Sequence, residues 1–397
     1  MNDIKWQENK MPKTADKNLS IMSIEEVKKA KAFHESFPQY SNTPLAELKE
    51  MSKYLGLGAI KVKDESYRFG LNAFKVLGGS YSMAKYIAQK MGKDVSELPY
   101  DVLVSKKLKD EFGQATFFSA TDGNHGRGVA WAANKLRQKC VIFMPKGTTE
   151  IRLNNILKEG ATATIEKYNY DECVRMAADA ASKVKNGVVI QDTAWEGYEE
   201  IPAWIMQGYG TMALESDEQF GEKPTHIFVQ AGVGSLAGAI VGYFSNKYKD
   251  NPPKMIVVEA SAAACLYKGA VAGDGNIRIV DGDLNTIMAG LACGEPNITS
   301  WDILKNHVDC FISAEDIIAA RGMRMLSAPL KGDAQVISGE SGAAPFGALA
   351  TIMLNDEYSE IRKKLDLNSN SKVLLFSTEG DTDPQRWKNI IWEAKNK

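Results

Sequence analysis

The sequence contains few cysteines and histidines and has no excess of charge of either sign. Its 397 residues include 48 basic and 50 acidic side chains, 5 cysteines and 4 histidines. The formal net charge of −2 provides no long-range attraction to nucleic acid or to an anionic membrane surface. The 44% of apolar and 25% of charged residues exclude the compositions of disordered, collagen-like and coiled-coil proteins.

The cysteines are spaced too widely for a disulfide scaffold or a zinc site. No two of them form a C-x-x-C pair, and the histidines are equally scattered. This usage favours a reducing compartment, so we expect a cytoplasmic protein without a bound metal. No apolar run approaches the roughly 20 residues that cross a bilayer, and the N-terminus lacks the basic and apolar regions of a signal peptide.

What the sequence does contain is a repeated alternation of short β-branched runs and longer amphipathic stretches. The predicted strands are 59–63, 115–119, 140–144, 161–165, 188–191, 225–230, 255–259, 309–312 and 373–377. The predicted helices are 74–91, 125–137, 150–158, 171–185, 202–215, 235–248, 314–326 and 341–354. This alternation predicts an α/β fold with two open, mostly parallel sheets wound with helices.

The length accommodates two domains at roughly 100–200 residues each. The alternation is interrupted at Gly78-Gly79 and at Trp195–Tyr198. We therefore predict a large domain formed by residues 1–79 and 190–397, with a small α/β domain of residues 80–189 inserted into it. Residues 1–20 are polar and aperiodic, and we expect them to form an arm.

Ligands of open α/β sheets bind where strands end and helices begin, and two candidate segments lie at such places. Lys75 stands among apolar and small residues near a helix start, where a lysine is suited to Schiff-base chemistry. An exposed helix lysine fits the same spacing. The segment Thr121–Gly128 carries three glycines. Asp122 or Asn124 would cap the following helix in one interpretation, and the backbone would approach a flat ligand in the other.

A third segment, Gln230–Gly238, joins a predicted strand to a predicted helix and is rich in glycine. Backbone N–H groups in such a loop bind phosphate with help from the helix dipole. Glu259 ends the next strand, where a dinucleotide-binding unit places its ribose-binding acid, although the spacing here is G-x-G-x-x-x-G. A nicotinamide-dependent oxidoreductase is therefore one alternative function.

A fourth segment, Leu375–Asp383, is a strand that runs into a polar turn. A hydroxyl of Ser377 or Thr378 suits a ring nitrogen of a ligand. A capped turn and an acidic cation site are the other interpretations of this segment.

In this order, the segments resemble the fold-type II family of pyridoxal-phosphate enzymes, which includes threonine dehydratase and the tryptophan synthase β chain. The resemblance covers residues 43–396 and begins at Thr43-Pro44-Leu45. Within that family the chain is similar to the diaminopropionate ammonia-lyases, because it shares further blocks with them. These blocks are Phe69–Lys75, Thr121–Ala132, Gln191–Tyr198, Ile287–Asn297, Ile337–Gly342 and Ser377–Asp383.

Two departures from the wider family also fit this subgroup. Asp122 precedes Gly-Asn-His where the dehydratases usually carry a small residue, so a carboxylate would lie beside the cofactor. Val233 and Ser235 interrupt the phosphate loop, which is nearly all glycine in the wider family.

The resemblance implies that pyridoxal 5'-phosphate is the cofactor and that Lys75 holds it covalently. The implied contacts are Gly232, Val233, Gly234 and Ser235 to the phosphate, Asn124 to the phenolic oxygen, and Ser377 or Thr378 to the pyridine nitrogen. A neutral hydroxyl at that nitrogen would leave it largely unprotonated and would favour β-elimination over transamination.

The implied reaction is the α,β-elimination of 2,3-diaminopropionate, in both D and L forms, to pyruvate and two ammonia. Lys75 and Asp122 would take the Cα proton from opposite sides, and Asp192 would hold the 3-ammonium group. A homodimer is also implied. The alternatives are a serine or threonine dehydratase-type lyase, the nicotinamide-dependent oxidoreductase, and a ligand sensor of the same fold.

Overall fold

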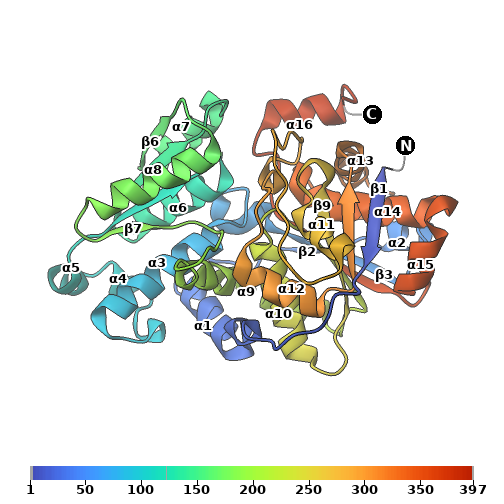
Figure 1. The fold of residues 1–397 in the computed structure, drawn as a ribbon, viewed down its shortest axis with the longest axis horizontal. Coiled ribbons are helices and arrows are strands. Elements are labelled where there is room, and N and C mark those ends of the chain that lie inside the picture. The colour runs from blue at the N-terminus through green and yellow to red at the C-terminus, as the bar shows by residue number, and fades with distance from the viewer. Residues whose placement is uncertain (1–2, 122, 396–397) are drawn as a thin grey trace. The chain divides into compact units, whose positions relative to one another are not determined.

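The computed structural model describes residues 3–121 and 123–395, in which helices alternate with strands along most of the chain (Figure 1). The strands form one sheet of seven strands and one of four. The chain divides into two compact units. The seven-stranded unit comprises Met1–Ile24, Asn42–Tyr67 and Met212–Lys397, and the four-stranded unit comprises Glu25–Ser41 and Arg68–Thr211. The boundaries that the sequence predicts for an inserted domain, residues 80–189, remain a prediction.

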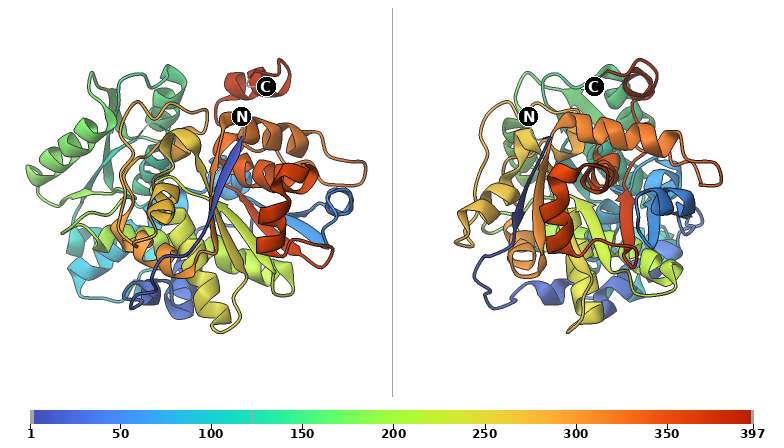
Figure 2. Two further views of the ribbon diagram at one scale, coloured as in Figure 1. Left: turned by 45° about the vertical axis from the view of Figure 1, so that its right-hand side comes forward. Right: turned by 90° about the vertical axis from the view of Figure 1, so that its right-hand side faces the viewer.

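The seven-stranded sheet has five parallel strands in its centre and an antiparallel strand at each edge. In spatial order its strands are β1 (Ile4–Glu8), β10 (Cys310–Ala314), β9 (Lys254–Ala260), β8 (His226–Gln230), β11 (Lys372–Ser377), β3 (Ala59–Asp64) and β2 (Leu45–Glu47). Figure 2 shows the blue N-terminal strand β1 along its sheet edge. The expectation of an arm over residues 1–20 is therefore wrong for β1. This strand is held by backbone pairing with β10, and its apolar alternation, Ile4 and Trp6, is too short to stand out in a polar segment.

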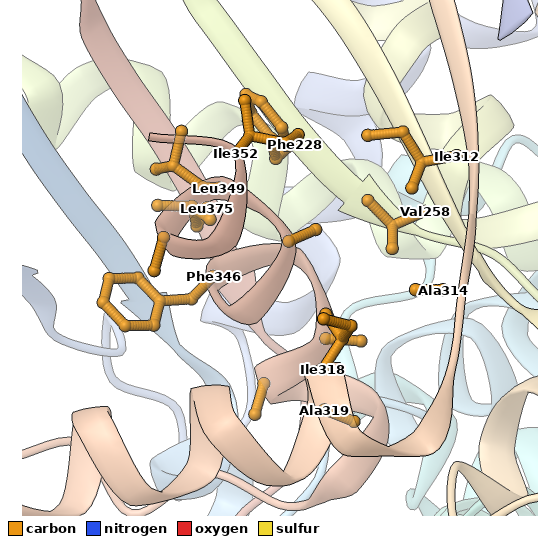
Figure 3. Packing of buried hydrophobic residues seen from close by; sticks show 14 of the residues in the cluster. Phe228, Val258, Ile312, Ala314, Ile318, Ala319, Phe346, Leu349, Ile352 and Leu375 are labelled. Carbon is orange, nitrogen blue, oxygen red and sulfur yellow. The ribbon is translucent and has the colours of Figure 1, made fainter. Parts of the chain in front are cut away.

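The helices of this unit cover both faces of its sheet. They are α2 (Lys49–Tyr54), α10 (Ser235–Tyr248), α11 (Cys265–Ala272), α12 (Ile298–His307), α13 (Asp316–Ser327), α14 (Glu340–Leu354), α15 (Ser359–Leu365) and α16 (Pro384–Ile391). The chain runs from β8 through β9 to β10 in one direction and returns to β11 in the other. Because parallel crossovers are right-handed, α10 and α14 lie on opposite faces. Phe346, Leu349 and Ile352 of α14 belong to the apolar core that packs on the strands (Figure 3).

The change of direction in this sheet occurs at β8, which has β9 on one side and β11 on the other. Ligands of open α/β sheets bind at such a switch point, outside the carboxyl ends of the strands. The pairing of Leu375 with Phe228, continued along both strands, places Ser377 level with Gln230. The segments that follow these two residues therefore begin at the same edge of the sheet.

The four-stranded sheet is entirely parallel, in the order β6 (Thr162–Ile165), β5 (Lys139–Met144), β4 (Thr116–Ala120) and β7 (Gly187–Val189). Its unit contains α1 (Ile24–Glu35), α3 (Val76–Met91), α4 (Tyr100–Leu103), α5 (Lys106–Phe112), α6 (Asn124–Lys135), α7 (Glu150–Lys158), α8 (Tyr170–Ser182) and the start of α9 (Glu200–Phe220). Ala177 and Ala181 of α8 pack on Phe118 of the sheet. On the other side, Phe117 contacts Tyr86 of α3 edge-on.

The predicted α/β fold with parallel sheets is confirmed. Within the described parts of the chain, no helix is both long and apolar enough to cross a membrane.

Candidate active site

Lys75 immediately precedes α3 and already has a helical backbone, with φ −56° and ψ −25°. Its side chain is 21% exposed and its Nζ forms an ion pair with Asp192 Oδ2. The same Nζ lies 5.3 Å from the centre of the Phe74 ring and 5.7 Å from that of Tyr209. Lys75 is therefore a largely buried, ion-paired group between aromatic rings, and the alternative of an exposed helix lysine is wrong.

Asp192 follows β7 in a loop that the preceding residue fixes to the sheet. The side chain of Gln191 accepts hydrogen bonds from Ser119 Oγ (3.0 Å) and Ala120 N (3.3 Å) and donates one to Ala120 O (3.1 Å). Its backbone N–H donates to the Tyr198 hydroxyl (3.0 Å). Because Gln191 is anchored through both its side chain and its backbone, the position of the Asp192 carboxylate is well defined relative to β4.

Two further side chains of this unit approach Asp192 Oδ2. The Tyr209 hydroxyl donates to it at 3.3 Å, and His125 Nδ1 lies 4.0 Å away. His125 Nε2 is 2.9 Å from the carbonyl oxygen of Ile190, which can only accept, so Nε2 carries a proton. Burial alone would raise the pKa of Asp192, but Lys75 and His125 outweigh burial and lower that pKa. Asp192 is therefore anionic at neutral pH and suited to holding a cation.

The glycine-rich segment before α6 has a different role from the one its composition suggests. A Cβ on Gly128 would lie 2.7 Å from the backbone nitrogen of Val76, and one on Gly126 would lie 3.2 Å from Ile142 Cγ2. Packing of α6 within the protein thus requires both glycines, and the interpretation that this backbone approaches a flat ligand stays a prediction. Asn124 is the first residue of α6 and is half-buried. Asp122 lies outside the described residues.

In the seven-stranded unit, residues 232–235 form the predicted glycine loop between β8 and the 14-residue helix α10. Gly234 adopts φ +102°, a conformation that favours glycine, and a Cβ on Gly232 would lie 3.1 Å from Gly290 O. Asn297 fixes the loop, because its N–H donates to Val233 O (2.7 Å) and its side chain donates to Ser235 Oγ (2.8 Å). A helix N-terminus with such a loop is suited to bind a phosphate dianion.

Ser377 ends the neighbouring strand β11 and Thr378 follows it, and both are buried. Ser377 Oγ donates to Ser338 Oγ (2.8 Å). Thr378 Oγ1 accepts from Gln230 Nε2 (2.7 Å) and donates to Glu379 Oε2 (3.0 Å). Gln230 Oε1 is buried with no hydrogen-bond partner among the described residues. This edge of the sheet therefore presents neutral hydroxyl and amide groups.

Glu259 does not occupy the place of a ribose-binding acid. Its carboxylate accepts the backbone N–H groups of Leu266 (2.8 Å) and Tyr267 (2.6 Å) at the start of α11. Burial raises its pKa to about 8. Because both oxygens of Glu259 cap the protein's own helix, the observation that favoured a dinucleotide site has a structural explanation.

The residues present fit pyridoxal phosphate. Taken by itself, the seven-stranded unit has an anion-binding loop and neutral polar groups at its switch point. The four-stranded unit, taken by itself, has a largely buried lysine of the kind that attaches this cofactor covalently. Within the described ranges, no three His, Cys, Asp or Glu side chains gather as a metal site would require. The Cys265 thiol contacts the carbonyl oxygens of Gly232 (3.9 Å) and Cys293 (3.7 Å), next to the glycine loop.

Sequence reasoning missed the groups that support the predicted residues. Ser338 and Asn297 lie in shared blocks that were noted only as blocks, so closer attention to their polar side chains would have identified them. Tyr209 carried no signal, because it stands among small and apolar residues of a helix. Gln230 opens the predicted segment Gln230–Gly238, but its side chain was not singled out.

Comparison with known proteins places the chain among enzymes. The family described as pyridoxal-phosphate dependent enzyme matches residues 37–378. A diaminopropionate ammonia-lyase of Salmonella typhimurium is 50% identical over 370 residues, which are 92% of this chain and 91% of that protein.

Solved structures of the Escherichia coli diaminopropionate ammonia-lyase are similar along almost the whole chain. The complex with D-serine has a TM-score of 0.89 at 42% identity and covers 99% of this chain and 98% of that one. The complex with an aminoacrylate-PLP azomethine reaction intermediate has a TM-score of 0.88 at the same identity and coverage.

Proposed function

This chain belongs to the family of pyridoxal-phosphate dependent enzymes, in the branch of the diaminopropionate ammonia-lyases, and we propose that it converts 2,3-diaminopropionate to pyruvate and two ammonia. The pair of Lys75 with Asp192 carries the proposal. An alkylammonium group already rests on that buried carboxylate, and the 3-ammonium group of the substrate is a group of the same chemistry. A serine hydroxyl would not need such an anion.

Pyridoxal 5'-phosphate is the cofactor, and when bound it supplies an electron sink for the electron pair left at Cα after proton removal. Lys75 holds it covalently through Nζ. Gly232, Val233, Gly234 and Ser235 bind its phosphate, supported by the positive φ of Gly234 and by the α10 N-terminus. Asn124 binds its phenolic oxygen, and Ser377 or Thr378 meets its pyridine nitrogen.

The reaction breaks the Cα–H bond and the Cβ–N bond of the substrate. Lys75 takes the Cα proton of one enantiomer and Asp122 that of the other, so both D and L forms react. Asp192 holds and orients the 3-ammonium group, which leaves as ammonia. The aminoacrylate that remains takes up water and yields pyruvate and the second ammonia. Acid–base help of this kind contributes about 10²–10⁴-fold per group.

The test is an assay of purified protein loaded with cofactor. We expect pyruvate and ammonia in a ratio of one to two from both isomers of diaminopropionate, and much slower pyruvate release from D- or L-serine. Faster turnover of serine would identify a dehydratase-type lyase instead. If the protein showed the cofactor absorbance but turned over no substrate, the alternative of a ligand sensor of the same fold would be favoured.

The two-base assignment has its own test. Asp122→Asn should lower turnover of the D isomer far more than that of the L isomer, because only the D isomer presents its Cα proton to Asp122. Equal losses on both isomers would refute it.

We also infer that the enzyme works as a homodimer in the cytoplasm. The family resemblance supports the homodimer, and the few, widely spaced cysteines support a reducing compartment. Light scattering on the eluted protein would report the mass of a dimer, twice the 43.6 kDa of the chain.

A further inference from the structure

Tyr209 touches the Asp192 carboxylate but belongs to none of the predicted site segments. It lies on α9 and its side chain is fully buried. Its hydroxyl donates to Asp192 Oδ2 at 3.3 Å, the same oxygen that pairs with Lys75. Burial raises its pKa far above the ordinary tyrosine value, so the phenol keeps its proton and acts as a donor.

The position of this ring depends on the absence of neighbouring side chains. A Cβ on Gly78 of α3 would lie 2.7 Å from Tyr209 Cε1, and a Cβ on Gly208 would collide with the backbone of Leu77. The two glycines thus allow α9 and α3 to approach closely. The Tyr209 ring then packs on Phe74 with centroids 4.7 Å apart, directly before Lys75. The close packing leaves the phenol one place, beside Asp192.

We propose that Tyr209 is a positioning residue that fixes Asp192 toward an ammonium leaving group and thereby selects diaminopropionate over serine. The inference rests on the proposed function. Lys75 must exchange partners during turnover, because it binds the cofactor and then takes a proton. The hydrogen bond from Tyr209 takes part neither in binding the cofactor nor in proton removal. It therefore holds Asp192 Oδ2 in place when Lys75 has left that oxygen. A serine hydroxyl carries no positive charge and gains nothing from this arrangement.

The experiment compares Tyr209→Phe with the wild-type holoenzyme on diaminopropionate and on D-serine. A hydrogen bond to a charged group corresponds to about a 10–100-fold effect, so kcat/KM for diaminopropionate should fall by that factor. The slow turnover of D-serine should change less than about 2-fold, and the absorbance of the bound cofactor should stay the same. Tyr243→Phe is the matched control, because that buried hydroxyl donates to another aspartate, Asp217, at 3.0 Å. Tyr243→Phe should change kcat/KM for neither substrate.

A binding measurement separates this inference from the proposed function. In the Lys75→Ala background, which cannot turn over substrate, calorimetry should show that adding Tyr209→Phe weakens diaminopropionate binding by about the same factor. Equal losses on both substrates, or no loss of binding, would overturn the positioning role. If the wild-type enzyme released no pyruvate from diaminopropionate while the difference in binding persisted, the proposed function would fail, and Tyr209 would position Asp192 for binding an ammonium group without its elimination.

Discussion

The two units of the chain carry chemically different groups at their candidate sites. The four-stranded unit presents charges: the Lys75 ammonium and the Asp192 carboxylate form an ion pair, and the His125 imidazole lies beside that carboxylate. The seven-stranded unit presents neutral donors and acceptors at the ends of β8 and β11. Its carboxylate Glu379 is bonded to protein donors, the Thr378 hydroxyl and the backbone N–H of Gly342.

This difference indicates a division of labour. Proton transfer and the holding of a cation require groups whose charge is set by near neighbours, and Asp192 owes its anionic state to Lys75 and His125. Binding a phosphate and a neutral ring nitrogen requires fixed dipoles that do not titrate, which Gly234, Ser377 and Thr378 provide. Substitutions in the first unit should therefore alter turnover, and those in the second should alter cofactor affinity.

The largest effect should come from Lys75→Ala. Removing the amine removes both the covalent attachment of the cofactor and a base, so turnover should fall by at least about 10⁴-fold. The visible absorbance of the lysine-bound cofactor should disappear as well. Lys85→Ala is a matched control on the same helix, since its side chain is also 21% exposed and ion-paired, in its case to Glu26. If Lys75→Ala kept the absorbance, Lys75 would not be the residue that binds the cofactor covalently.

Asp192→Asn should lower kcat/KM for diaminopropionate by about 10²–10³-fold. Removing one partner of a buried charge pair costs about 3–5 kcal/mol. Here the lost carboxylate is also the proposed partner of the substrate's 3-ammonium group. Steady-state kinetics at saturating cofactor measures the effect, and the cofactor affinity should change little. Asp217→Asn, which alters an aspartate bonded to Tyr243 and Tyr248, should leave kcat/KM unchanged. A loss of cofactor affinity equal to the loss of kcat/KM would contradict the division of labour.

The sequence predicted the central sheets well because buried parallel strands and their crossover helices have strong periodicity. The predicted helices at 150–158 and 235–248 have the bounds of α7 and α10. The edge strand β1 was missed because pairing with β10 holds it, and only tertiary structure provides that partner. The first helix, α1, was missed for a related reason: its apolar side chains pack within the unit but follow several charged residues.

For the site, the sequence could predict residues in recognisable blocks but not their supports. Lys75, Asp192 and the loop at 232–235 stand in such blocks. Tyr209 reaches Asp192 from a helical stretch of mostly small and apolar residues, and Gln230 is a single amide at the end of a buried strand. Neither contact follows from spacing, because each depends on how closely two elements pack. The close packing around Gly126 and Gly128 could not be predicted for the same reason.

A smaller effect is expected from Gly234→Ala, in the glycine loop of the seven-stranded unit. A positive φ at a residue with a side chain costs about 1–3 kcal/mol, so cofactor affinity should fall by about 10–100-fold. Turnover at saturating cofactor should stay close to wild type. Fluorescence titration of the apoprotein with pyridoxal phosphate measures the affinity. Gly92→Ala introduces the same strain at φ +64° after α3, with open space around it, and should not change the affinity. A fall in kcat with unchanged cofactor affinity would contradict the expectation that this unit acts through cofactor binding.

The last effect concerns stability rather than turnover and involves Glu259, the residue before the last of β9. Burial raises its pKa in the folded protein to about 8, from 4.5 when exposed, so it is largely protonated at pH 7. A raised pKa in the folded state stabilises the protein below pH 4.5. That contribution is lost as the pH rises through about 8, with a slope of at most about 1.4 kcal/mol per pH unit. Glu259→Gln cannot titrate, so its stability relative to wild type should improve from pH 5 to pH 9.

Urea denaturation at pH 5, 7 and 9 measures this difference between the variant and the wild type. At pH 5 the variant should be the less stable protein, because its amide nitrogen cannot accept the second backbone N–H that the carboxyl holds at the start of α11. At pH 9 the gap should narrow or reverse, since only the wild type then carries a buried charge. The exposed Glu111→Gln should show no such trend. A pH-independent gap for Glu259→Gln would mean that Glu259 keeps one charge state from pH 5 to pH 9, and a raised pKa for Glu259 would then be wrong.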